Sequence, residues 1–139
     1  MKFKAILLAV CAAALLSGCE TAGTTLTLNH NDGSSVLYEG NTRLHNKVAV
    51  TAVTYDKVPM GLNRVNIQLT SLVQREIRLQ YRIAWYNAEG MEIDGDSRTY
   101  RPLILQGLDS VTVTGVANSP AAVTSRIRVR ELRAADHLR

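Results

Sequence analysis

The alternation of apolar and polar residues between positions 77 and 86 is the sequence feature that most constrains the fold. Apolar side chains occupy one set of alternate positions: Ile77, Leu79, Tyr81, Ile83 and Trp85. The positions between them are mostly polar and include Arg78, Gln80 and Arg82. Successive side chains of a β-strand point to opposite faces, so this pattern predicts a strand with one buried face. No stretch after residue 18 shows a helical period.

The same alternation recurs in residues 64–69, 111–114 and 126–130, which predicts three further strands. The apolar residues Val48 and Val50 are out of phase with Val53 and Tyr55, which predicts a β-bulge in the strand that contains them. Residues typical of turns separate these segments, at 59–63, 87–90, 94–96 and 118–120.

The turn at 87–90 has a specific chemistry. The side chain of Asn87 is expected to close an Asx-type turn, and Gly90 is expected to adopt a positive φ where the chain re-enters a strand.

These strands predict an all-β domain, an antiparallel immunoglobulin-like β-sandwich of about seven strands. A small closed barrel is the alternative. Trp85 is the only tryptophan and lies on the apolar side of the longest strand. We expect it to fill the core between two sheets. The alternative role for its ring is to stack on a ligand.

The N-terminus predicts a lipoprotein signal peptide over residues 1–18. Lys2 and Lys4 precede an apolar run over residues 5–16, and Ser17 and Gly18 lead into Cys19. The run is shorter than the roughly 20 apolar residues that a membrane-spanning helix needs. Cys19 is therefore the expected lipidation site, because its thiol is the group that accepts diacylglycerol before cleavage. An ordinary secretory signal is the alternative.

The chain after Cys19 divides into three predicted parts. Residues 19–45 are rich in Thr, Gly, Asn and Ser and are expected to form a lipidated flexible tether. A short edge strand at residues 34–38 is the one element predicted within it. The β-sandwich domain is predicted over residues 46–133, and residues 134–139 are predicted to be a C-terminal tail.

The net charge that remains after signal-peptide removal, and the residue that follows Cys19, limit the partner and the membrane that we expect. Loss of residues 1–18 removes two of the 16 basic side chains and none of the 12 acidic ones, so the formal net charge falls from +4 to +2. This balance argues against a nucleic-acid partner. An aspartate directly after the lipidated cysteine favours retention in the inner membrane. This chain has Glu20 at that position, which favours anchoring to the periplasmic side of the outer membrane. Without Cys11, and with Cys19 acylated, the folded domain has no cysteine.

Residues 81–93, which read YRIAWYNAEGMEI, resemble the signature of the YcfL family of small bacterial lipoproteins. Residues 111–129 resemble the closing strands of that family. The sequence departs from the family pattern at Asn87, where an aspartate is common, and at Thr70-Ser71, where an asparagine is expected. The resemblance implies a β-fold and a place in the cell envelope, and it implies no catalytic residues.

The sequence predicts no catalytic, cofactor or metal site. His30, His45 and His137 have no ligand spacing and no cysteine partners, and they are expected to be solvated. No serine lies in a G-x-S-x-G turn of the kind that presents a nucleophile. Asp94 and Asp96 flank Gly95 in what is expected to be a plain turn. We therefore predict that the protein is not an enzyme.

The arginine distribution is the one pattern that indicates a binding surface. The candidate residues are Arg78, Arg82, Arg126, Arg128 and Arg130. If their two strands share a sheet, its outer face carries a basic stripe suited to bidentate contact with carboxylate or phosphate. The alternative is that charge on an edge strand prevents aggregation.

The sequence thus predicts a membrane-anchored, non-enzymatic interaction module of the cell envelope. Its partner is expected to be another envelope protein. The alternative is a binder of an anionic envelope polymer, peptidoglycan or lipopolysaccharide, through the arginine-lined face.

Overall fold

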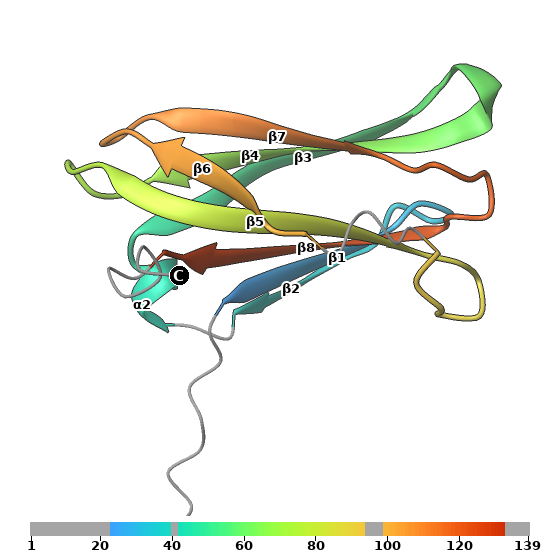
Figure 1. The fold of residues 1–139 in the computed structure, drawn as a ribbon, viewed down its shortest axis with the longest axis horizontal. Coiled ribbons are helices and arrows are strands. Elements are labelled where there is room, and N and C mark those ends of the chain that lie inside the picture. Colours follow the sequence, from blue (N-terminus) through green and yellow to red (C-terminus); the bar gives the residue numbers. More distant parts are fainter. Residues whose placement is uncertain (1–22, 40–41, 94–98, 133–139) are drawn as a thin grey trace, which may run out of the picture.

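The computed structural model describes residues 23–39, 42–93 and 99–132, which form two antiparallel sheets packed against each other (Figure 1). The strands are β1 Thr24–Asn29, β2 Ser35–Glu39, β3 Val48–Val58, β4 Leu62–Ser71, β5 Ile77–Tyr86, β6 Arg101–Leu105, β7 Ser110–Val116 and β8 Thr124–Glu131. A short helix, α2 Thr42–His45, and a 3-10 turn, η1 Pro59–Gly61, lie on either side of β3. Across the described ranges, none of the helices has the length and apolar character that crossing a membrane requires.

The two sheets differ in size. The larger has the strand order β2-β1-β8-β5-β6, and the smaller has the order β3-β4-β7. All strand pairs are antiparallel. Two separate sheets confirm the predicted all-β sandwich rather than the closed barrel. Pro102 lies in β6, at the edge of the larger sheet. Proline has no backbone N–H group, and an edge strand tolerates it because one side of that strand has no partner strand to bond.

The core lies between the inner faces of the sheets, as the alternation predicts. Val65, Ile67 and Leu69 of β4 are buried, and the polar residues between them are not. On the opposite sheet Leu79 is buried and Trp85 is only 1% exposed. The predicted packing role of Trp85 is therefore confirmed.

One local prediction is confirmed in full and another in part. The pairing of β3 with β4 shifts register between Val50 and Ala52, which is the bulge that the change of phase indicates. In the turn after β5, the Asn87 side-chain oxygen accepts a hydrogen bond of 2.9 Å from the Met91 N–H, four residues on, so Asn87 closes the turn but does not form an Asx turn, which bonds to the residue two positions on. Gly90 in the same turn has a φ of 80°.

The prediction of a flexible tether is wrong for residues 24–39. β1 and β2 fall in this segment, and β1 pairs with β2 on one side and with β8 on the other. Leu26 and Leu28 of β1 point into the core, whereas Thr25 and Thr27 alternate with them. Pairing with β2 and β8 stabilises β1, although the polar composition of the segment alone would not. The edge strand expected at residues 34–38 is present as β2.

Candidate functional site: the arginine face

The candidate arginines lie on adjacent strands of the larger sheet. Arg126, Arg128 and Arg130 alternate along β8 with Ile127 and Val129, which are buried in the core. Because neighbouring side chains of a strand point to opposite faces, the three arginines point outward. Arg78 and Arg82 point outward from β5 in the same way, and β5 pairs with β8. We call the outer surface of this sheet the arginine face.

The position of β8 excludes the edge-protection explanation for its arginines. β8 is the central strand of the five, with β1 on one side and β5 on the other. Its backbone hydrogen-bonding groups are already paired on both sides, so its side chains have no open edge to guard. A row of three outward arginines on a central strand needs another explanation.

The strand register places like charges opposite each other. Arg82 of β5 lies directly across from Arg128 of β8. Directly opposed residues of an antiparallel pair have Cβ atoms about 4.5–5.5 Å apart, and like charges in such a pair are destabilising. Opposed arginines are stabilised by an anionic group beside them, and Glu92 supplies such a group to Arg82.

These two arginines help to line a shallow hollow of about 170 Å³, which we call the arginine hollow. Its lining comes from β1, β5 and β8 and consists of Thr25, Arg82, Ala84, Tyr86, Arg126 and Arg128. Ala84 faces outward by its register with Arg126, yet it is only 2% exposed. A small side chain between long neighbours leaves the space that forms the hollow.

Two of the three arginines in the hollow have partners. Arg82 Nη2 donates hydrogen bonds of 3.3 and 3.4 Å to the carboxylate of Glu92. The Arg126 guanidinium carbon lies 4.5 Å from the centre of the Tyr86 ring, a cation–π distance. Arg128 is exposed and has no acidic or aromatic partner in the part of the chain that the structure describes. Its donors therefore remain open to a ligand.

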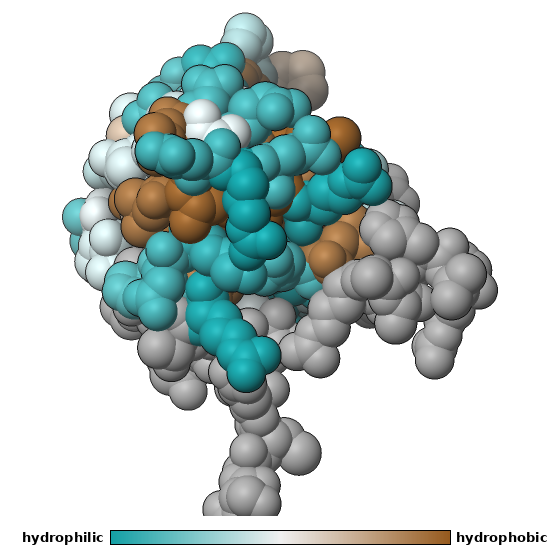
Figure 2. Space-filling view, turned by 90° about the vertical axis from the view of Figure 1, so that its left-hand side faces the viewer, coloured by the Kyte–Doolittle hydropathy of each residue, from teal (hydrophilic) through white to brown (hydrophobic). Residues whose placement is uncertain are grey.

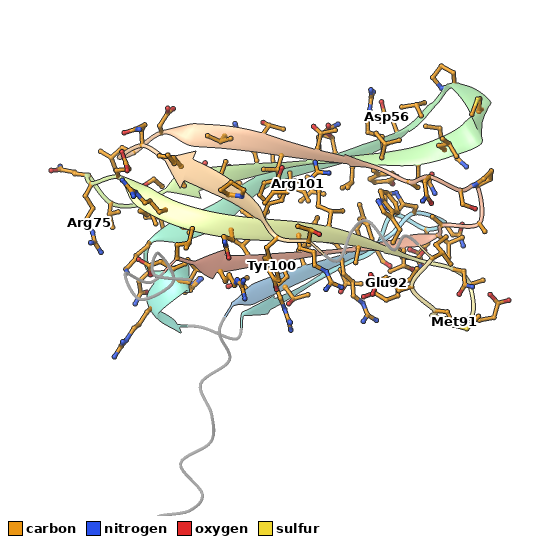
Figure 3. The ribbon with its side chains drawn as sticks, in the orientation of Figure 1. Asp56, Arg75, Met91, Glu92, Tyr100 and Arg101 are labelled. Atoms are coloured by element: carbon orange, nitrogen blue, oxygen red, sulfur yellow. The ribbon has the colours of Figure 1, made fainter. Side chains whose placement is uncertain are left out.

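The other two candidate arginines do not line the hollow. Arg130 donates through Nε to Gln80 Oε1 at 2.9 Å, and its guanidinium lies 3.8 Å from the centre of the Tyr100 ring. Arg78 lies at the start of β5, four residues before Arg82, and forms an ion pair of 3.2 Å with Glu76. Figure 3 shows Glu92 and Tyr100 at different points along the larger sheet. Their contacts with the arginines depend on strand pairing, so the sequence pattern did not identify either residue.

The expectation that His30 is solvated is wrong. Its ring lies 5.0 Å from Trp85 and 5.7 Å from Tyr55, measured between ring centres. His30 Nε2 and Ser125 Oγ share a hydrogen bond of 2.9 Å, whereas Nδ1 is buried without a hydrogen-bond partner. His30 immediately follows β1, and the pairing of that strand holds the ring against the core. His45 is exposed, and His137 lies outside the described residues.

The contact between His30 and Ser125 does not form an accessible nucleophile. Ser125 is fully buried, so a substrate cannot reach its hydroxyl group. Among residues 23–39, 42–93 and 99–132, no three His, Cys, Asp or Glu side chains are grouped so that they could hold a metal ion. The Asp94–Asp96 turn and the expected lipidation site, Cys19, both lie outside the described residues.

The environment of His30 predicts a loss of stability between pH 7.5 and 5.5. Burial, and then the positive charge of Lys57, lowers the pKa of His30 below its ordinary value of 6.5. Just below pH 6.5 the unfolded chain therefore binds a proton that the folded chain does not. The contribution of neutral His30 to the free energy of unfolding is fully present above pH 6.5. It is lost as the pH falls towards the lowered pKa of the folded state. Urea-unfolding midpoints at pH 7.5, 6.5 and 5.5 measure this loss.

The matched variant is His30→Gln, which keeps a polar partner for Ser125 but does not titrate. We expect its midpoint to change less over this range than that of the unmodified chain. Parallel curves for the unmodified chain and His30→Gln would contradict the assignment.

Comparisons with other proteins identify one family. A model of the family described as "Protein of unknown function (DUF1425)" matches residues 35–131, the stretch from the start of β2 to the end of β8. No curated protein matches the sequence.

Two of the solved structures that are similar to this one have comparable folds over most of their length. The crystal structure of a DUF1425 family member from Shewanella has 29% sequence identity and a TM-score of 0.56. The similarity covers 63% of this chain and 80% of that one. The crystal structure of Campylobacter jejuni cj0090 has 15% identity and a TM-score of 0.52, over 60% of this chain and 85% of that one. The second comparison supports the fold alone.

Proposed function

This chain belongs to the DUF1425 family of proteins of unknown function, and we propose that it is a lipoprotein whose periplasmic domain acts as a non-enzymatic interaction module of the cell envelope. Within that family, residues 81–93 favour the YcfL group of small lipoproteins. The proposed contact surface is the arginine hollow, and the proposed partner presents carboxylate or phosphate groups to it. An anionic envelope polymer, peptidoglycan or lipopolysaccharide, fits this chemistry best.

The proposed location depends on the N-terminal sequence. Two lysines, an apolar run and a small-residue pair precede Cys19, so we infer that Cys19 carries the lipid. Two or more acyl chains attach a protein to a bilayer stably, whereas a single chain does so only marginally. Glu20 at the next position favours the outer membrane. We therefore assign the domain to the periplasmic side of that membrane.

The opposition of Arg82 and Arg128 is the observation that supports the binding function. The two guanidinium groups lie on adjacent strands, and the Glu92 carboxylate offsets the charge of Arg82 but is not paired with Arg128. An anion bound beside Arg128 would add an attractive interaction to this pair of like charges. Arginine binds carboxylate and phosphate through two parallel N–H groups, so each side chain can hold one such group in a defined orientation. The buried Ala84 beneath them lets a ligand group approach the sheet.

Co-sedimentation with purified peptidoglycan and with lipopolysaccharide tests this function. We expect binding at low salt and markedly weaker binding at high salt, because added ions screen exposed charges. Replacing Arg126 and Arg128, which line the hollow, by glutamine should weaken binding at least tenfold, since a hydrogen bond to a charged group contributes about 1.5–3 kcal/mol. The melting temperature should change little, because these side chains lie outside the core.

The matched control is Arg75→Gln with Arg101→Gln, which removes two exposed arginines outside the hollow and should leave binding intact. Glu92→Gln should strengthen binding, because the carboxylate that Arg82 now contacts would be neutral. If neither polymer binds, the polymer assignment is wrong. A photo-crosslinking residue at Thr27, beside Arg126, would then capture an envelope protein if an acidic protein segment is the partner.

A further inference from the structure

One end of the sandwich, which we call the anchor end, carries the point where the chain enters the domain. β1 begins there, because Thr24 pairs with Val129 near the end of β8. Gly23 packs so closely on the Val129 carbonyl group that a Cβ atom would overlap it. The loop between β4 and β5, the loop between β6 and β7, and α2 lie at the same end (Figure 1).

The chain length limits how the domain can sit on its membrane. If Cys19 is lipidated, four residue steps separate it from Gly23, and a fully extended chain spans at most about 14 Å over that distance. β5 has ten residues and is about 33 Å long. The link is therefore too short to let the domain stand on its opposite end, about 33 Å away. The proposed anchor keeps the anchor end close to the membrane.

Two leucines at the anchor end are exposed to solvent. Leu72 is 50% exposed and Leu108 is 60% exposed, in the two loops that meet there. Backbone hydrogen bonds of 2.9 Å join the loops, from Ser71 to Asp109 and from Leu108 to Val73. Leu108 has a φ of 57°, a conformation that leucine rarely adopts. The packed loops thus hold an apolar side chain in solvent at some conformational cost.

The charged residues around the leucines suit a phospholipid headgroup region. Arg43 and Arg75 are exposed at this end, and Figure 3 shows Arg75 projecting from it. Asp109 and Glu76 are also exposed there, and Glu76 is paired with Arg78. Figure 2 looks onto this end and shows apolar surface between hydrophilic side chains. Apolar residues bordered by basic ones are typical of surfaces that rest in a membrane interface.

We propose that the anchor end docks on the phospholipid surface that holds the Cys19 lipid, with Leu72 and Leu108 inserted at the interface. This proposal rests on the proposed lipid anchor and adds a fixed orientation to it. The strands then run away from the membrane. The arginine hollow faces sideways, where an envelope component can reach it.

Fluorescent probes at single positions test the docking. The lipidated chain carries an introduced cysteine, labelled with an environment-sensitive probe, in phosphatidylethanolamine–phosphatidylglycerol vesicles with or without brominated lipid. With Leu72→Cys, we expect brominated lipid to quench at least half of the emission. Met91→Cys is the matched control, because Met91 is 62% exposed and lies at the opposite end. Thr27→Cys reports on the arginine face. Neither control probe should be quenched.

Each other result would overturn the docking. Quenching at position 27 would mean that the sheet lies flat on the membrane. Emission at position 72 that depends on protein concentration in detergent, without lipid quenching, would indicate a second copy of the chain. If the protein floats with the vesicles but position 72 is not quenched, the docking fails and the lipid anchor stands. If the protein does not float, the lipid anchor fails as well.

Discussion

Replacing Trp85 by alanine is expected to lower the free energy of unfolding by about 3–5 kcal/mol. Trp85 is among the largest fully buried side chains, and its removal would leave a cavity between the two sheets. The ring also supports His30, whose centre lies 5.0 Å from it. Small domains typically have only about 5–15 kcal/mol of stability, so the variant should be near its unfolding threshold at 37 °C.

Urea unfolding followed by circular dichroism measures this loss, because the variant has no tryptophan fluorescence. Trp85→Phe is the matched control, since it keeps an aromatic ring in the core and should lose less stability. Iodide quenching of the unmodified chain gives an independent check. A buried indole is poorly quenched, and strong quenching would show that Trp85 is a surface residue instead.

The sequence predicts those elements whose evidence is local. The strand at 77–86 carries five alternating apolar residues, so its burial pattern follows from its own side chains. The bulge in β3 and the turn at Asn87 likewise depend on residues within a few positions of each other. Local patterns of this kind are sufficient to predict a sandwich and a buried Trp85.

β1 was not predicted because its stability comes from distant partners. Its sequence, TTLTLN, has only two large apolar residues, and the threonine-rich surroundings indicate a tether. The segment is ordered because Leu26 lies beside Ile127, about a hundred positions further along the chain. The same pairing explains the error at His30, which β1 delivers to the core. No feature of the residues around His30 identifies Trp85 or Ser125 as its neighbours.

The arginine face was predicted in part for the same reason. Strand alternation correctly placed Arg126, Arg128 and Arg130 on the outside of β8. It did not predict that β8 is the central strand or that Arg82 lies opposite Arg128, because both depend on the order of the strands. The central position of β8 argues against edge protection as the role of its arginines.

Replacing Cys19 by alanine is expected to reduce fatty-acid incorporation to background. The Cys19 thiol is the group that we propose accepts diacylglycerol, and alanine has no nucleophile. Without the modification, the signal peptide should remain uncleaved at this position. Lipidation should therefore be lost completely rather than in part. Metabolic labelling with a radioactive fatty acid, followed by electrophoresis, measures the result.

Cys11→Ala provides a matched control within the same chain. Cys11 lies in the apolar run of the predicted signal peptide and is the only other cysteine, so its replacement should leave labelling unchanged. If Cys19→Ala still incorporates fatty acid, the lipid is attached elsewhere and the anchor assigned to Cys19 is wrong. The proposed docking of the anchor end would then fail as well, because the short link to β1 is measured from Cys19. The arginine hollow would remain a candidate binding site, since its geometry depends only on β1, β5 and β8.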